Sequence, residues 1–260
     1  MSENLCVDRD GAVLTVTFDR PPQHNAMTFE MYEGLYAACE TADGDAGVKV
    51  MVLRGAGGRA FVSGTDITQF RQFRDGSDGV AYERRIARVL NRLEDVRVPT
   101  VAAVSGYCVG GGLAIAAVCD LRVATRSSRF GMPIARTLGN CLSANTMSIL
   151  VGQLGPARAL DLVLRARLLD GSEAHAAGFV AELCDDDALD RAVGAVVETL
   201  LSHAPLTMWA TKVAVARLRR ANLPDSDDLV ARVFGSEDFR RAVASFGASG
   251  ERRPPTWTGE

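Results

Sequence analysis

The chain has 260 residues, long enough to bury a substantial core in one domain or in a domain with an appendage. Its formal net charge of −3 gives no global positive field, so we expect no nucleic-acid partner. The charged first residues argue against a signal peptide. No run of about 18 uncharged apolar residues occurs, which argues against a membrane span. The six cysteines have no CxxC spacing and indicate reduced thiols in a cytoplasmic protein.

The first half of the chain predicts an alternation of strands and helices. β-branched or continuous apolar runs predict strands at 12–18, 48–55, 98–106 and 121–125. Apolar residues at helical spacing predict one helix over 28–41, followed by a stop at Gly44, and another that follows three glycines and ends near Val118. This order of elements is typical of an α/β core.

Two parts of this first half look like copies of one unit. Val48 and Val98 begin equivalent strands, and each strand leads through a glycine-containing loop to the start of a helix. Asp66 is placed to cap the first of these helices. The sequence therefore predicts a strand–loop–helix unit that is used at least twice, although the identity between the copies is weak.

The second half predicts mostly helices. Helical patterns occur at 143–152, 156–166, 172–177, 186–202, 205–220 and 225–235. Residues 207–220 carry an apolar stripe that is consistent either with subunit contacts or with packing inside the chain. The charged, proline-containing end "GERRPPTWTGE" is interpreted as a tail.

The two glycine loops offer the clearest chemical signal. Backbone N–H groups at a helix start carry positive partial charge, so two such loops aimed at one point form a site for a developing oxyanion. Glycines then let a ligand lie against bare backbone. The alternative is that Gly110, Gly111 and Gly112 only permit tight packing, and periodicity alone leaves both interpretations open.

Other common catalytic motifs are poorly supported. "GAGGRA" at 55–60 fits a dinucleotide-binding pattern, but "FVSG" follows where a helix should open, so we interpret the stretch as a turn. The three histidines are isolated, with no partner at metal-ligand spacing, and we expect no metal site. No phosphate loop or nucleophile elbow is present.

Several segments together resemble the crotonase, or enoyl-CoA hydratase/isomerase, family. "AFVSGTDITQF" (60–70) and "VPTVAAVSGYCVGGGLAIAAVCDLRVAT" (98–125) resemble its two most specific motifs. Weaker matches are "DRPPQHNAM" (19–27), "SRFGMP" (128–133), "GPARALDLVLRARLLDGSEAHAAGFV" (155–180) and "VFGSEDFRRAVASF" (233–246). The resemblance implies a crotonase-like spiral of β-β-α turns over residues 1–195 and a helical, trimer-forming C-terminal region over 196–260.

The resemblance also implies a site. The N–H groups of Thr65 and Gly111 match the two amides with which family members bind an acyl-CoA thioester oxygen and stabilise an enolate. Positions matching those that contact substrate or coenzyme A are Asn25, Ala26, Ser63, Asp66, Ile67, Gly110, Phe234 and Arg252. Coenzyme A would enter as part of the substrate, with no permanently bound cofactor. A homotrimer or a dimer of trimers is implied as well.

The chain departs from the family at the two glutamates that hydratases use. Ala114 and Ile134 stand at those positions, so hydration by that pair is not expected. Relatives run isomerase, hydrolase, dehalogenase or decarboxylase reactions on the same scaffold, which leaves two alternatives: a different acid or base, or a protein that binds acyl-CoA without turnover. The candidate polar side chains are Arg136, Asn140, Cys141 and Ser143 on the altered loop, and Tyr82 and Glu83 on the helix after the first glycine loop. We interpret Cys141 as buried filler and Glu83 as a solvated helix charge.

Overall fold

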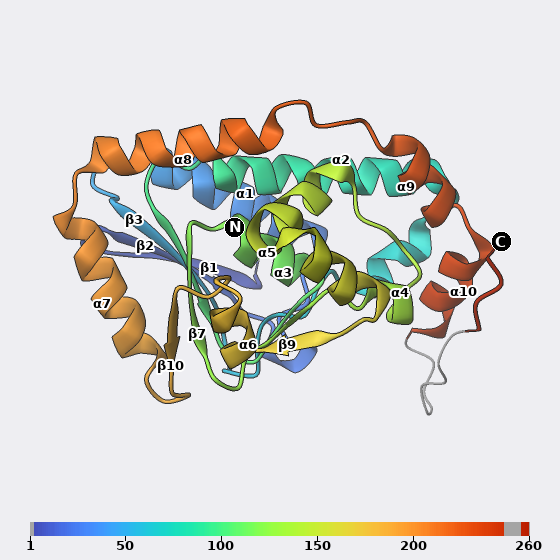
Figure 1. Cartoon of the computed structure of the whole chain (residues 1–260), viewed down its shortest axis with the longest axis horizontal. Helices are drawn as coiled ribbons and strands as arrows, with labels where there is room; N and C mark the ends of the chain where they lie inside the picture. The colour runs from blue at the N-terminus through green and yellow to red at the C-terminus, as the bar shows by residue number, and fades with distance from the viewer. Residues whose placement is uncertain (1–2, 247–255, 260) are drawn as a thin grey trace.

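Two β-sheets organise the computed structural model, which describes residues 3–246 and 256–259 (Figure 1). The larger sheet has the strand order β1-β2-β3-β5-β7-β10, and the smaller has the order β4-β6-β8-β9. The strands are β1 Leu5–Asp10, β2 Val13–Phe18, β3 Val50–Gly55, β4 Ala60–Val62, β5 Thr100–Val104, β6 Tyr107–Val109, β7 Leu121–Thr125, β8 Arg129–Gly131, β9 Leu168–Asp170 and β10 Glu182–Cys184. All neighbours are parallel except β1–β2 and β8–β9.

The two sheets are joined by a repeated β-β-α unit. The helices are α1 Phe29–Gly44, α2 Gly76–Glu94, α3 Gly111–Val118, α4 Ile134–Thr137, α5 Ala144–Leu164, α6 Gly171–Ala176, α7 Leu189–Ser202, α8 Pro205–Arg220, α9 Asp227–Phe234 and α10 Glu237–Ser245, with 3-10 helices η1 Pro21–Gln23 and η2 Ile67–Gln72. One unit is β3-β4-α2 and the next is β5-β6-α3, with β3 paired to β5 and β4 paired to β6. The predicted repeat is therefore present, and each copy contains a second short strand that the prediction lacked.

Side chains of the large sheet alternate between two cores, as the two-residue period of a strand requires. Met51, Leu53 and Ala102 face α1, α2 and α3, while Val52 and Val101 face α7. Helix α3 is buried over nearly its whole length, which accounts for its almost purely apolar sequence. The predicted boundary between residues 195 and 196 falls inside α7, because the apolar face of that helix continues along the sheet through Val197.

Helix α5 contains the break that separates two of the predicted helices. Gly155 has φ 74° and ψ 159° inside the helix, and Pro156 follows it. By length and mean hydropathy alone, α5 is also the one helix among residues 3–246 and 256–259 that is long and apolar enough to cross a membrane. This is weak evidence, since a core helix passes the same test.

The first predicted copy of the unit differs at its helix. Asp66 does cap a helix, with Oδ1 accepting from the Thr68 N–H at 3.1 Å, but that helix is the short η2. The long helix α2 begins only at Gly76, where the side chain of Asp75 provides the cap.

The C-terminal helices wrap one side and one end of the molecule. In Figure 1, α8 runs along the upper edge from α7, and α9 and α10 close the right-hand end. Helix α9 packs against α2, and α10 packs against η2. Within the apolar stripe predicted at 207–220, Ala216 is buried whereas Leu218 is 78% exposed, so packing within the described chain covers only part of it; Leu206, just before this range, is 75% exposed.

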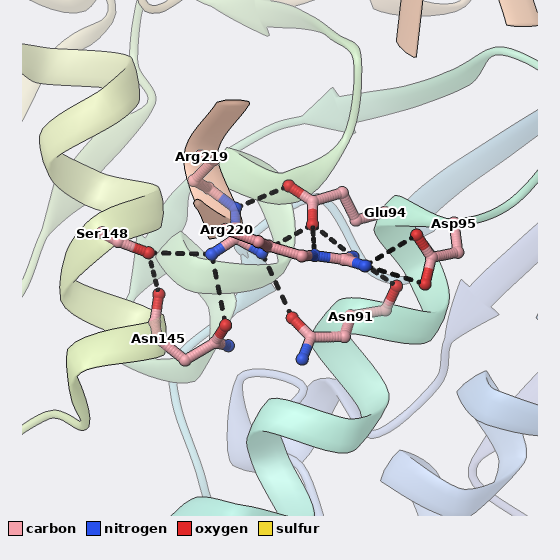
Figure 2. A network of polar contacts seen from close by, with 7 residues as sticks. All are labelled: Asn91, Glu94, Asp95, Asn145, Ser148, Arg219 and Arg220. Atoms are coloured by element: carbon pink, nitrogen blue, oxygen red, sulfur yellow. Dashed lines mark hydrogen bonds and ion pairs between the residues drawn. The ribbon is translucent and has the colours of Figure 1, made fainter. Parts of the chain in front are cut away.

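Helix α8 is tied to α2 and α5 by a buried polar network (Figure 2). Arg219 donates to both Glu94 oxygens at 2.7 and 2.5 Å, and its remaining N–H groups reach Asn91, Asn145 and Ser148. Arg220 also pairs with Glu94. The carboxylate of Glu94 therefore faces two guanidinium groups, with 13% of its side chain exposed.

We expect Glu94→Gln to lower the free energy of unfolding by about 3 kcal/mol, because the Arg219 guanidinium, with 10% of its side chain exposed, loses its counter-charge, whereas Arg220 keeps its second partner, Asp95. Denaturant titration at one fixed protein concentration measures the change. The matched control is Asp185→Asn, which neutralises the partner of Arg126 in a pair with both side chains more than half exposed and should cost less than about 1 kcal/mol. Equal effects of the two substitutions would contradict the role assigned to the network.

Candidate active site

A pocket lies where the two β-β-α units meet. Its walls come from the loop after β4, the loop and helix after β6, one face of α2, and the segment from Met132 to Thr146. The parallel pairing of β4 with β6 sets the two glycine loops side by side. A Cβ built on Gly64 would lie 3.9 Å from the Gly111 nitrogen, which shows how closely the loops approach.

Thr65 and Gly111 both line this pocket. Within the described part of the chain, neither of their backbone N–H groups has a hydrogen-bond acceptor. Their neighbours are engaged, since the Gly110 N–H donates to the Gly131 carbonyl at 3.0 Å and the Asp66 N–H donates to the Met27 carbonyl at 2.8 Å. Backbone N–H groups without a hydrogen-bond acceptor are uncommon in folded proteins. The two at this pocket are therefore a pair of donors available to a ligand.

The three glycines have structural reasons of their own. Gly110 has φ +57°, a conformation that side chains disfavour. A Cβ on Gly111 would lie 2.4 Å from the Tyr32 hydroxyl oxygen, and one on Gly112 would lie 2.1 Å from the Val62 carbonyl oxygen. The packing interpretation therefore holds for the side-chain positions of Gly111 and Gly112, while the Gly111 N–H remains available to a ligand.

Three hydroxyl groups form a chain behind the Thr65 amide. The Thr65 hydroxyl is hydrogen-bonded to Tyr32 at 2.9 Å and to Tyr82 at 2.7 Å. Burial raises the pKa of Tyr32 to about 12, and burial also raises the pKa of Tyr82, so both phenols stay neutral. These contacts fix the Thr65 side chain, and with it the loop that carries the amide.

The positions of the two missing glutamates are in the pocket wall. Ala114 on α3 and Ile134 at the start of α4 both line the pocket, with 1% and 9% of their surfaces exposed. Together with Met132 and Leu138 they make this side of the pocket apolar.

A carboxyl enters the pocket from a different element. Glu83 on α2 lines the pocket with 4% of its surface exposed, so its interpretation as a solvated charge is wrong. Its Oε2 accepts from the Ser143 N–H at 2.8 Å, and it forms no ion pair within the described residues. Burial raises the pKa of Glu83, and the hydrogen bond from Ser143 acts in the opposite direction.

A sequence signal for Glu83 does exist. It lies on the buried stripe of α2 between Gly79 and Ile86, at the three- and four-residue spacing of a core face. A charge at such a position is buried once the helix packs.

The altered loop after β8 contributes Asn140 to the pocket wall. The Asn140 Oδ1 is buried without a hydrogen-bond partner in the described part of the chain. Cys141 packs against the aromatic cluster under α9 and α10, and burial raises the pKa of its thiol to about 12. A neutral thiol is a poor nucleophile, which agrees with its interpretation as filler, although Cys141 is partly buried and not fully buried as predicted.

The remaining predicted contact residues lie partly in the pocket wall and partly outside it. Ser63, Ile67 and Gly110 line the pocket with Thr65 and Gly111. Ala26 lies on the neighbouring loop, where its carbonyl accepts from Arg20. Arg252 lies outside the described residues.

Asn25, Asp66 and Phe234 have well-defined structural contacts. Asn25 is fully buried at φ 56°, and its amide donates to the Ala56 and Ala60 carbonyls. Asp66 caps η2 and pairs with Arg20 at 3.1 Å; although burial opposes it, the hydrogen bonds from Thr68 and Arg20 lower the pKa of Asp66. Phe234 is buried behind the pocket wall, with its ring centroid 5.9 Å from that of Tyr82.

Comparison with known proteins gives one consistent result. The sequence profile described as enoyl-CoA hydratase/isomerase matches residues 8–260. A probable enoyl-CoA hydratase of Rhizobium meliloti is 33% identical over 249 residues, which cover 94% of this chain and 95% of that protein. The short-chain-enoyl-CoA hydratase of Clostridium acetobutylicum is 27% identical over 247 residues, 94% of each chain.

Solved structures agree with the sequence comparisons. The crystal structure of an enoyl-CoA hydratase/carnithine racemase from Magnetospirillum magneticum superposes with a TM-score of 0.81 at 34% identity, covering 100% of this chain and 97% of that one. An enoyl-CoA hydratase from Mycobacterium avium subsp. paratuberculosis gives a TM-score of 0.82 at 28% identity, covering 98% of each chain. The spiral fold that the motifs imply is thereby confirmed.

We expect Gly112→Ala to lower the free energy of unfolding by about 1–3 kcal/mol, because the new methyl group would overlap the Val62 carbonyl. The control is Gly152→Ala on α5, where a Cβ meets nothing within 4 Å and alanine should stabilise the helix by about 0.5–1 kcal/mol. Denaturant unfolding of both variants gives the comparison. A Gly112→Ala protein as stable as the wild type would contradict the close approach described here.

Proposed function

Since this chain belongs to the enoyl-CoA hydratase/isomerase family, whose members process acyl-CoA, we propose that it stabilises a thioester enolate between the Thr65 and Gly111 amides. The observation that carries the proposal is the pair of N–H groups, drawn from two adjacent loops, whose residues line one pocket and which donate to no acceptor within the described residues. A thioester carbonyl oxygen is an acceptor of the matching kind. Coenzyme A would enter as part of the substrate, with no permanent cofactor.

The chemistry expected of such a pair is electrostatic. Removing a proton from the carbon next to a thioester carbonyl places negative charge on the oxygen, and two fixed N–H dipoles stabilise that charge without reorganising. Loss of one such donor typically costs 10²- to 10³-fold in rate, about 3–4 kcal/mol. The hydroxyl chain through Tyr32 and Tyr82 would hold the Thr65 amide in place for this task.

The reaction proposed here does not use the glutamate pair of the family's hydratases. Ala114 and Ile134 carry no ionisable group, so neither can activate water or protonate carbon. The apolar wall that they form also favours a second candidate function, a protein that binds acyl-CoA without turning it over. A third arrangement, an isomerase or hydrolase that uses another acid or base, is compatible with the same amides.

We propose that the protein assembles as a homotrimer or a dimer of trimers. The support is the exposure of three apolar side chains on α8, Leu206, Val215 and Leu218, each of which is more than half exposed. Burial of such side chains against another subunit would remove apolar surface from water.

We expect hydration of crotonyl-CoA to be at least about 10²-fold slower than by the Clostridium short-chain-enoyl-CoA hydratase under the same conditions, because a positioned acid or base contributes 10²- to 10⁴-fold. Loss of the conjugated thioester absorbance measures the rate. A panel of CoA thioesters followed by mass spectrometry then separates an enzyme, which forms product from at least one of them, from a binder, which forms none. Hydration of crotonyl-CoA at the rate of the Clostridium enzyme would show that this chain hydrates its substrate without the two glutamates of the family's hydratases.

We expect the carbonyl stretch of carbonyl-¹³C butyryl-CoA to shift to lower frequency when the thioester binds, because two N–H donors polarise the C=O bond. Isotope-edited infrared spectroscopy measures the shift. Thr65→Pro, which deletes one donor, should reduce the shift, whereas Thr65→Ser keeps both the amide and the hydroxyl that bonds to Tyr32 and Tyr82 and should retain it. Circular dichroism and unfolding establish that each variant folds, and a bound wild-type thioester with an unshifted carbonyl would refute the assignment.

A further inference from the structure

Glu83 is the only carboxyl group that lines the pocket in the described part of the chain. It is 96% shielded from solvent and has no ion-pair partner among those residues. An unpaired carboxylate in such a position costs free energy relative to the same group in water. The sequence nonetheless has an acid at this position.

The contact made by Glu83 does not by itself call for an acid. The Ser143 N–H, at the N-terminal cap of α5, needs an acceptor and finds Oε2 at 2.8 Å. A glutamine carbonyl at the same place would accept the same bond without a buried charge. The structural role and the acidic role can therefore be separated by a substitution that preserves shape.

The surroundings of Glu83 place the acid near the proposed oxyanion site. Tyr82, its neighbour on α2, is hydrogen-bonded to the Thr65 hydroxyl at 2.7 Å. The charge on Glu83 also contributes to the raised pKa of both Tyr32 and Tyr82, whose hydroxyls bond to the Thr65 hydroxyl. Ala114 and Ile134, which also line the pocket, supply no competing acid or base.

We propose that Glu83 is the proton-transfer residue of this site and exchanges the hydrogen on the carbon next to the thioester carbonyl. The inference rests on the proposed function, because only an acyl-CoA held by the Thr65 and Gly111 amides presents such a carbon to the pocket. A single carboxyl group that accepts a proton and returns it is suited to an isomerisation, in which hydrogens of the substrate are rearranged. It is poorly suited to the addition of water.

The step balances within the substrate and Glu83. The carbon–hydrogen bond breaks, its electron pair forms the carbon–carbon double bond of the enolate, and the carbonyl electrons move to the oxygen held by the two amides. The proton passes to a Glu83 carboxylate oxygen. Return of a proton from Glu83 to carbon restores the thioester, and in D₂O the returned nucleus is a deuteron once the carboxyl has exchanged with solvent.

The experiment incubates the full-length protein with butyryl-CoA in D₂O and follows deuterium in the acyl group by mass spectrometry. Wild-type protein is expected to incorporate deuterium, and the rate of incorporation by Glu83→Gln is expected to be lower by a factor of about 10² or more. Glu33→Gln, on the exposed face of α1, removes one carboxylate outside the pocket and should leave the exchange rate unchanged. Titration calorimetry with butyryl-CoA and thermal unfolding show that Glu83→Gln still binds and folds.

The pH profile gives a readout that a purely structural role would not move. Exchange needs the carboxylate form, so the wild-type rate should rise with pH through the pKa of Glu83, at a pH above the ordinary glutamate value of 4.5. The residual rate of Glu83→Gln should lack that step. Exchange by Glu83→Gln at the wild-type rate, or binding without exchange by the wild type, would overturn the proposal for Glu83, whereas failure of the wild type to bind butyryl-CoA would overturn the proposed function itself.

Discussion

The parallel pairing of β4 with β6 is the interaction on which the site depends. Each strand has only three residues, yet their register sets two loops from different repeats side by side. The larger sheet supports this pairing, because β3 and β5, which lead into those strands, are themselves parallel neighbours. A site made of backbone amides can be placed only by backbone geometry, and this fold supplies it through repetition of one unit.

Much of the fold could be predicted from the sequence where a pattern runs for many residues. The helix predicted at 205–220 is α8, Pro205–Arg220, and the predicted gap between two helices is the break at Gly155. Short strands such as β4 and β8 were missed because three residues carry no alternation. The edge strand β1 was missed for another reason, since its sequence "LCVDRD" is largely exposed and charged.

The site shows a similar division. Thr65 and Gly111, which the motifs single out, line the same pocket, because both belong to segments whose spacing is fixed by the fold. Glu83 was misjudged because a single charge on a helix is usually solvated, and its burial depends on which face of α2 packs inward. Its partner, the Ser143 N–H, comes from a loop 60 residues along the chain, which no local pattern connects to it.

The contact between Tyr32 and Gly111 has a consequence for how such a sequence can evolve. A side chain in place of Gly111 would fit only if Tyr32 were replaced by a residue without its phenol, because the Tyr32 hydroxyl oxygen lies 2.4 Å from where the Cβ would be. The residue at position 32 therefore limits which residues are tolerated at position 111, and the reverse also holds. We expect the two positions to covary across related sequences. An aromatic residue on α1 thus limits the choice of amino acid in a loop that is remote from it along the chain.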